Sequence, residues 1–105
     1  METHIRTFIM DMADSADAAL IEHALRGNES AFAELVRRYQ AVVWGTVHRI
    51  LGNSSECEDA VQEVFLRALS SLRKFDPTHP LGPWILRIPT NYCIALLRRR
   101  TARQY

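Results

Sequence analysis

The chain of 105 residues is long enough for one domain with a single small hydrophobic core. Its hydrophobic content of 48%, with only four Gly and four Pro, is typical of a folded globular protein and excludes an intrinsically disordered one. No apolar run reaches the length of a membrane-spanning helix, and the first residues lack the pattern of a secretory signal. We therefore expect a cytoplasmic protein.

The net charge of +1 conceals a strong polarity along the chain. Up to Leu66 there are five Arg against eleven Asp and Glu, whereas from Arg67 onward there are seven Arg and one Lys against Asp76 alone. The two parts therefore carry about −6 and +7. This polarity suits a protein that offers an acidic surface to one partner and a basic surface to another. The alternative is an accidental asymmetry that serves solubility alone.

The first half of the chain predicts two helices after an N-terminal arm. Residues 1–14 show no helical period and are expected to be a flexible arm, with residues 15–105 forming one helical domain. A short helix is predicted from about Asp17 to Arg26, where Gly27 ends it. The next helix begins with Asn28 or Ser30 as its cap and runs to about residue 51.

The second half predicts two more helices joined by a stiff loop. Ser55, Glu56 and Glu58 have the spacing of a capping box for a helix that continues to about residue 74. Residues 76–83 hold three of the four prolines and form the loop, and a last helix runs from about residue 83 or 84 to about residue 100. Pro89 predicts a kink or a break in that helix. The expected fold is all-α, a compact bundle of about four helices.

The third predicted helix has two chemically different faces. One is an ordinary apolar stripe at helical spacing: Val61, Val64, Phe65, Ala68 and Leu72. The other is a mixed acidic and apolar strip that a core does not require: Asp59, Gln62, Glu63 and Leu66. A helix with a second, specific face is usually built to dock on a partner. We therefore interpret this strip as a binding surface.

The last predicted helix combines a core stripe with a basic and aromatic face. The expected core stripe is Ile85, Ile88, Tyr92 and Leu96, while Trp84, Arg87, Asn91 and Arg98 share another angular position. Arg98, Arg99 and Arg100, with Arg103 beyond, add a footprint for a phosphate backbone. Together these side chains suit single-stranded or melted nucleic acid. The alternative is that Trp84 belongs to the core, Asn91 is solvated and the arginines stabilise a helix C-terminus through its dipole.

Catalytic and metal-binding chemistry finds no support in the sequence. No nucleophile, base and oxyanion donor occur in a recognisable arrangement, and no histidine stands in a Glu-x-x-His pattern opposite the acidic residues. We expect no catalytic residues, no metal, no cofactor and no enzymatic activity. Cys57 and Cys93 have no metal-ligand spacing and are expected to be buried free thiols, although a disulfide remains open.

Several spaced motifs, in order, resemble one family. They are GNESAFAELVRRYQ at 27–40, ILGNSSECEDAVQEVFLRAL at 50–69, KFDP at 74–77 and the W-x-x-R-I-x-x-N-x-C-I-x-L-L-R-R-R pattern at 84–100. Residues from about 17 to 104 are similar to the core-binding and promoter-recognition domain of bacterial RNA polymerase sigma factors, the sigma-two domain. The extracytoplasmic-function (ECF) group is the most similar.

The resemblance implies roles for two groups of residues. Contacts to the clamp helices of the β′ subunit of RNA polymerase core would be made by Asp59, Gln62, Glu63, Leu66 and Leu69. Contacts to the minus-ten region of promoter DNA would be made by Asp76, Thr78, His79, Trp84, Arg87, Asn91, Arg98, Arg99 and Arg100, with the loop from Asp76 to Gly82 holding a flipped base. An anti-sigma factor is a further expected partner.

Three features depart from the family pattern. Ala95 stands where the family usually has Asp, and Pro89 where it usually has Ala. The second DNA-binding domain, which reads the upstream promoter element, is not part of this sequence. We therefore expect a transcription initiation factor domain that binds polymerase and recognises and melts the minus-ten element. The alternative is a regulatory module, bound by an anti-sigma factor or acting as a decoy, that binds without initiating.

Overall fold

The computed structural model describes residues 17–104, and all regular structure in this range is helical. A short helix over residues 17–25 is followed by α2 (Glu29–Leu51), α3 (Cys57–Ser71), the 3₁₀ turn η1 (Leu72–Lys74) and α4 (Leu81–Gln104). The predicted all-α bundle of about four helices is confirmed. The predicted arm over residues 1–14 lies outside the described residues.

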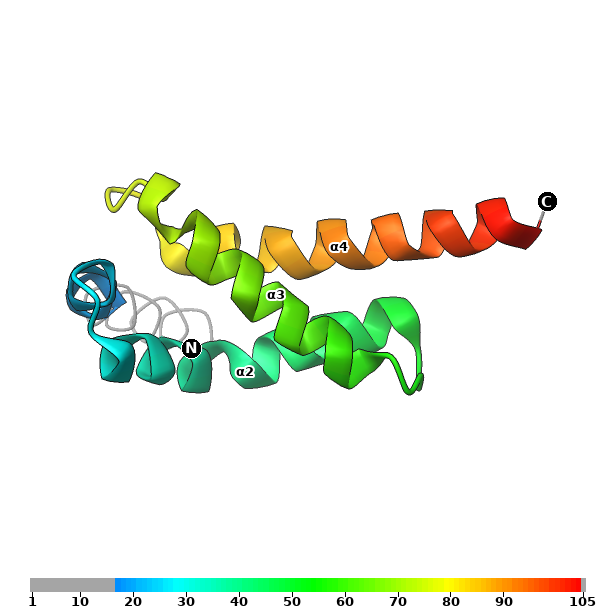
Figure 1. The fold of residues 1–105 in the computed structure, drawn as a ribbon, viewed down its shortest axis with the longest axis horizontal. Helices are drawn as coiled ribbons and strands as arrows, with labels where there is room; N and C mark the ends of the chain where they lie inside the picture. The colour runs from blue at the N-terminus through cyan, green and yellow to red at the C-terminus, as the bar shows by residue number, and fades with distance from the viewer. Residues whose placement is uncertain (1–16, 105) are drawn as a thin grey trace, which may run out of the picture.

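The three long helices pack against one another in a flat arrangement. Figure 1 shows α2 and α4 running lengthwise, with α3 crossing obliquely between their ends and the short first helix beside the start of α2. Each pair among α2, α3 and α4 is in contact. The last turns of α4 extend past the neighbouring helices, so the arginine-rich end of the chain projects from the bundle.

The boundaries of α2 follow from local chemistry. Gly27 adopts φ 93° and closes the first helix: its N–H donates to the Ala24 carbonyl, and the Asn28 N–H donates to the His23 carbonyl. The side chain of Asn28 then caps α2 by accepting from the Ala31 N–H at 3.1 Å. Of the two caps expected, Asn28 is therefore the one used.

The predicted capping box at the start of α3 is wrong. Ser55 and Glu56 lie in a turn, and α3 begins at Cys57 with Glu56 as its N-cap residue. Glu56 has φ −80° and ψ −10°, which is helical rather than the extended backbone that a capping side chain needs, and it makes no cap hydrogen bond. Ser54 Oγ instead accepts from the Glu56 N–H at 3.1 Å and orders the turn.

The predicted break at Pro89 is also wrong, because α4 is helical throughout Leu81–Gln104. Pro89 cannot donate to the carbonyl one turn earlier, but its ring is fully buried, so packing offsets the lost hydrogen bond. The helix also begins earlier than expected, at Leu81. Pro83 therefore lies in the first turn, where backbone N–H groups have no partner in the helix.

The core consists of two adjoining clusters. The larger joins the second half of α2 to α3 and to the middle of α4, and its buried members are Val43, Val47, Leu51, Cys57, Ala60, Val61, Val64 and Cys93. The smaller joins the first helix and the start of α2 to the loop before α4 through Ile21, Leu35, Leu72, Phe75 and Leu81. The predicted stripes are confirmed: Phe65, Ile88, Tyr92 and Leu96 are partly buried, and the other members are buried.

The first helix is attached to α2 by a buried carboxylate. Asp17 is almost inaccessible to solvent and accepts hydrogen bonds from the Tyr39 hydroxyl and, at 3.3 Å, from Arg38 Nη1. Ile21 packs one turn later into the smaller cluster. A polar contact and an apolar contact thus hold the same short helix, which could not be stable alone.

We predict that Asp17→Ala lowers the free energy of unfolding by roughly 1–3 kcal/mol, because it leaves the Tyr39 hydroxyl without this buried acceptor. Urea denaturation measures the change. The control is Glu22→Ala, which breaks the exposed Glu22–Arg26 pair on the same helix and should cost less than about 1 kcal/mol. Equal losses for the two variants would contradict the anchoring role of Asp17.

Candidate binding surfaces

The second face predicted on α3 is exposed in the structure. We call it the α3 outer face, and it consists of Asp59, Gln62, Glu63, Leu66 and Leu69. All but Glu63 are exposed, and Glu63 is half-buried. Leu66 is 61% exposed and Leu69 46%, so two large apolar side chains face solvent between polar neighbours. That combination is typical of a docking surface.

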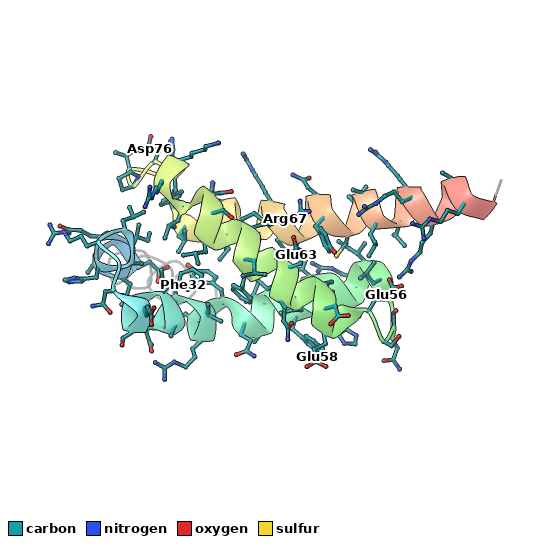
Figure 2. The ribbon with its side chains drawn as sticks, viewed as in Figure 1. Phe32, Glu56, Glu58, Glu63, Arg67 and Asp76 are labelled. Atoms are coloured by element: carbon teal, nitrogen blue, oxygen red, sulfur yellow. The ribbon has the colours of Figure 1, made fainter. Side chains whose placement is uncertain are left out.

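An apolar groove adjoins the α3 outer face on the side of α2. It has a volume of about 410 Å³ and is lined by Phe32, Val36, Gln40, Val61, Gln62, Phe65 and Leu66. Gln62 and Leu66 therefore belong both to the outer face and to this groove. The α2 residues are absent from the predicted site, although the i, i+4 spacing of Phe32 and Val36 was a usable signal. Figure 2 labels Phe32 on α2.

On the opposite edge of the outer face, Glu63 is linked to α4 through Arg67. Glu63 Oε1 lies 3.1 Å from Arg67 Nε, and the Arg67 guanidinium carbon lies 4.8 Å from the centre of the Tyr92 ring. The ion pair holds the arginine over the aromatic ring, where a cation–π contact adds attraction. Figure 2 shows Glu63 and Arg67 along the part of α3 that crosses α4.

The loop before α4 is ordered by Asp76. Its Oδ1 accepts from the Thr78 N–H at 2.9 Å and from the Thr78 hydroxyl at 2.7 Å, and its Oδ2 lies 3.5 Å from His79 Nε2. The hydrogen bonds from the Thr78 backbone and then from its hydroxyl lower the pKa of the Asp76 carboxyl. Desolvation opposes them, and the nearby His79 lowers the pKa by less than desolvation raises it. The loop therefore carries a stable negative charge.

This loop and the start of α4 enclose a pocket of about 430 Å³. It is lined by Lys74, Phe75, Asp76, His79, Pro80, Pro83, Trp84 and Arg87. Trp84 packs against the smaller core cluster, with its ring centre 5.0 Å from that of Phe75 at an interplanar angle of 52°. Trp84 is thus partly buried against the core and also lines the pocket, and its contact with nucleic acid stays a prediction. We call this hollow the loop pocket.

The remaining predicted nucleic-acid contacts do not form one continuous site with the loop pocket. Asn91 and Arg99 line a separate groove of about 360 Å³ between α3 and α4, together with Arg67, Ser71, Ile88, Tyr92 and Ala95. Arg98 is exposed. Arg100 forms an ion pair with Glu56 at the start of α3, a contact that the sequence did not reveal. Thr78 orders Asp76 and does not line the loop pocket.

The part of the chain that the structure describes contains no group of side chains suited to a metal ion, and no helix in it is long and apolar enough to cross a membrane. Cys57 and Cys93 are buried free thiols in the larger cluster. Burial, followed by the neighbouring Cys57, raises the pKa of the Cys93 thiol. These thiols are therefore part of the packing.

Comparison with known proteins identifies the family. The sigma-70 region 2 family matches residues 35–103, which include α3 and the loop pocket. The chain belongs to this family. It is 34% identical to the ECF RNA polymerase sigma factor SigW of Bacillus subtilis over 85 residues, which cover 81% of this chain and 46% of SigW. It is 33% identical to the RNA polymerase sigma factor CnrH of Cupriavidus metallidurans, over 88% of this chain and 48% of CnrH.

Solved structures of sigma factors have the same fold. An engineered region 2 of sigmaE in complex with GTAAAA superposes with a TM-score of 0.75 at 34% identity, covering 83% of this chain and 90% of that one. CnrH in complex with the cytosolic domain of CnrY gives a TM-score of 0.70 at 30% identity, covering 84% of this chain and 61% of CnrH. The resemblance to ECF sigma factors is confirmed, and the chain spans about half the length of these curated relatives.

The geometry around Asp76 makes a direct prediction for its ionisation. Thr78→Ala removes the hydroxyl donor and keeps the backbone donor, so the pKa of Asp76 should rise part of the way towards its ordinary value. His79→Ala should raise it less, because the histidine acts only through its charge. In the unaltered region 2 domain the lowered pKa means that loop order is lost only as the pH falls through that lowered value. An NMR titration that follows the carboxyl chemical shift of Asp76 measures its pKa in the unaltered protein and in both variants. An unchanged pKa of Asp76 in Thr78→Ala would contradict the role of the Thr78 hydroxyl.

Proposed function

We propose that this chain binds RNA polymerase core through α3 and recognises and melts the minus-ten promoter element through the loop pocket and α4. The observation that carries the proposal is the separation of two unlike surfaces on one small bundle. The α3 outer face is acidic and apolar, whereas α4 contains five Arg and neither Asp nor Glu. Membership of the sigma-70 region 2 family supports the same division.

The polymerase-binding surface is the α3 outer face with its adjoining groove. Leu66 and Leu69 supply apolar area, and Asp59, Gln62 and Glu63 supply charge and hydrogen-bonding groups around it. Such a patch matches a basic helical partner with an apolar ridge, and we propose the clamp helices of the β′ subunit for that role. Phe32 and Val36 extend this surface onto α2.

The DNA-binding surface begins at the loop pocket. Trp84 offers an aromatic surface, Arg87 a charged donor, and the Asp76–Thr78 loop supplies polar edges at the rim. Stacking on an aromatic ring contributes about 1–3 kcal/mol per base, which is comparable to the few kcal/mol that extrusion of a base costs. The pocket therefore holds an unpaired base that α4 helps to keep separated. The sigmaE region 2 structure, solved with GTAAAA, supports this assignment.

Arg98 and Arg99 supply phosphate contacts further along α4 because both are exposed and neither is used by the ion pair that holds Arg100. The protein then acts by binding rather than by catalysis: it stabilises the melted promoter because it binds separated strands more tightly than the duplex. Its site of action is the cytoplasm, and residues 15–105 form the acting domain. The CnrH–CnrY structure supports a protein regulator of the anti-sigma class as an additional partner.

We predict that Asp59→Ala and Gln62→Ala each weaken binding to RNA polymerase core at least about fivefold, which corresponds to roughly 1 kcal/mol for a central interface residue. Both side chains are exposed, so the melting temperature should stay unchanged. Glu29→Ala, which removes an exposed acidic residue from the first turn of α2, is the matched control. Binding as weak in the control as in the two variants would mean that only net charge matters, and the proposed surface would be wrong.

A further inference from the structure

We propose that the N-terminal segment before Asp17 docks through residues 8–12 on an apolar strip between α2 and α4, and that it thereby shields arginines of α4. We call this surface the rear strip. Its exposed apolar members are Val42 of α2, which is 47% exposed, and Ile94 of α4, which is 39% exposed. The shielding rests on the proposed function, whereas the docking of the segment does not.

Helical geometry places Val42 on the side of α2 that faces away from α3. Successive residues of an α-helix are about 100° apart, so Val42 and Trp44 flank the buried Val43 on opposite sides. Trp44 follows Gln40 by one turn, and Gln40 lines the apolar groove beside α3. Val42 therefore faces the other way.

The same argument places Ile94 on the side of α4 away from α3. Tyr92 and Ile94 flank the buried Cys93, and the Tyr92 ring lies against Arg67 of α3. Because α2 and α4 pack directly against each other through the larger core cluster, Val42 and Ile94 border this packed contact on the same side. The two exposed side chains therefore belong to one surface.

The first described residue lies beside the rear strip. Asp17 accepts hydrogen bonds from Arg38 and from the Tyr39 hydroxyl, and Arg38 precedes Val42 by one turn on the same side of α2. Nine residues, 8–16, reach at most about 30 Å. Two helical turns are about 11 Å long. The segment that precedes Asp17 is therefore long enough to reach both sides of the strip.

The sequence of the segment matches the strip in chemical character. Residues 8–12 read FIMDM, so four of these five side chains are large and apolar. Burial of these side chains against exposed apolar groups is favourable. A segment tethered one turn away has an effective concentration in the mM range, which a second copy of the chain would reach only at mM protein concentration. This tethering is why we assign the strip to the segment and not to a second copy.

Charge complementarity supports the same occupant. The stretch from 8 to 16 contains Asp11 and Asp14 and neither Lys nor Arg. Arg87 and Arg98 lie near the angular position of Ile94 because they are seven residues before it and four after it. Both arginines are exposed, and neither forms an ion pair within residues 17–104. The acidic part of the segment thus meets uncompensated positive charge.

Docking of the segment controls how available these arginines are for DNA. Arg87 and Arg98 belong to the proposed DNA-binding surface, so carboxylates held beside them compete with phosphates for the same guanidiniums. When a surface is free in only one-third of the molecules, its apparent affinity for a ligand is about threefold weaker than its intrinsic affinity. The segment therefore lowers DNA affinity without making any contact with DNA.

NMR of the full chain tests the docking without DNA. The double variant Phe8→Ser and Ile9→Ser should shift the amide signals of residues 42–46 and 90–97, because it removes the apolar side chains that cover them. The signals of residues 69–73, at the far end of α3 beside the first helix, should stay unchanged. Unchanged signals in both parts of the strip would overturn the docking.

Val42→Ser is the reciprocal variant, and it should shift the signals of residues 8–12. The matched control is Leu25→Ser, which alters a side chain of similar exposure, 41%, on the first helix and should leave those signals unchanged. Circular dichroism checks that each variant is folded. If the signals of the strip depend on protein concentration and not on the segment, a second copy covers the strip and the proposal is wrong.

DNA affinity tests the shielding. Fluorescence anisotropy with a short single-stranded DNA containing GTAAAA should show about threefold tighter binding by Val42→Ser and by the double variant, and no change for Leu25→Ser. Val42 lies on α2, outside the proposed DNA-binding surface, so a gain must come from release of the segment. Unchanged affinity in a variant whose NMR signals show that release would refute the shielding.

The two measurements separate this inference from the proposed function. If the unaltered protein has no affinity for single-stranded DNA, alone or with core polymerase, the proposed function and the shielding fail together. The NMR comparison still decides whether the segment docks, because it uses no nucleic acid. If DNA binds and the strip signals ignore the segment, the proposed function stands and this inference is wrong.

Discussion

The arrangement of both surfaces depends on how α3 packs across α2 and α4. At this crossing Val64 is completely buried and Ala68 is almost completely buried. Cys57, at the start of α3, and Leu72, directly after its end, are also buried. A helix packed along one stripe must present the opposite side to solvent, so the burial of these residues places Asp59, Gln62 and Leu66 outside. The exposed leucines of α3 are therefore a consequence of which stripe the core uses, and they are available for a partner.

The same packing links α3 to the basic α4 at two points. Arg67, which is paired with Glu63 of its own helix, lies over Tyr92, and Glu56 pairs with Arg100. These pairs are half-exposed, so each adds little stability, but each decides which arginines remain available. Arg100 has a protein partner, whereas Arg87, Arg98 and Arg99 form no ion pair within residues 17–104. These three arginines therefore give α4 a positive charge that no carboxylate in the described part of the chain pairs with.

Much of the fold could be predicted from the sequence because helical periodicity directly reports burial. The apolar stripe can be recognised from the sequence alone: Val61, Val64, Ala68 and Leu72. Gly27 and Gly52 mark helix ends, where both adopt positive φ angles. Prediction failed at two places for different reasons. Pro89 is tolerated in α4 because its ring is buried, and this tertiary contact has no signal in the neighbouring sequence. At the start of α3 the sequence offers two adjacent serines, and Ser54 rather than Ser55 makes the local hydrogen bond that orders the turn.

The positions of the candidate site residues in the fold were predictable to a similar degree and for similar reasons, whereas their roles stay predictions. The outward direction of Gln62 and Leu66 follows from the helical period, and Trp84 and Arg87 lie one turn apart on α4. The contribution of Phe32 and Val36 to the groove beside α3, and of Arg67 to the groove beside α4, depends on contacts between helices that periodicity cannot reveal. The pairing of Arg100 with Glu56 joins residues far apart in the chain and is equally hidden.

The central claim is that one bundle engages two partners at once through separate surfaces. The most direct measurement is NMR mapping of the protein during addition of a β′ clamp-helix fragment, followed by single-stranded DNA. The account predicts that the fragment shifts amide signals in residues 59–69 of α3 and in the facing part of α2, that DNA shifts those in residues 75–100, and that both remain bound together. Displacement of the fragment by DNA, or a shared set of shifted signals, would contradict it.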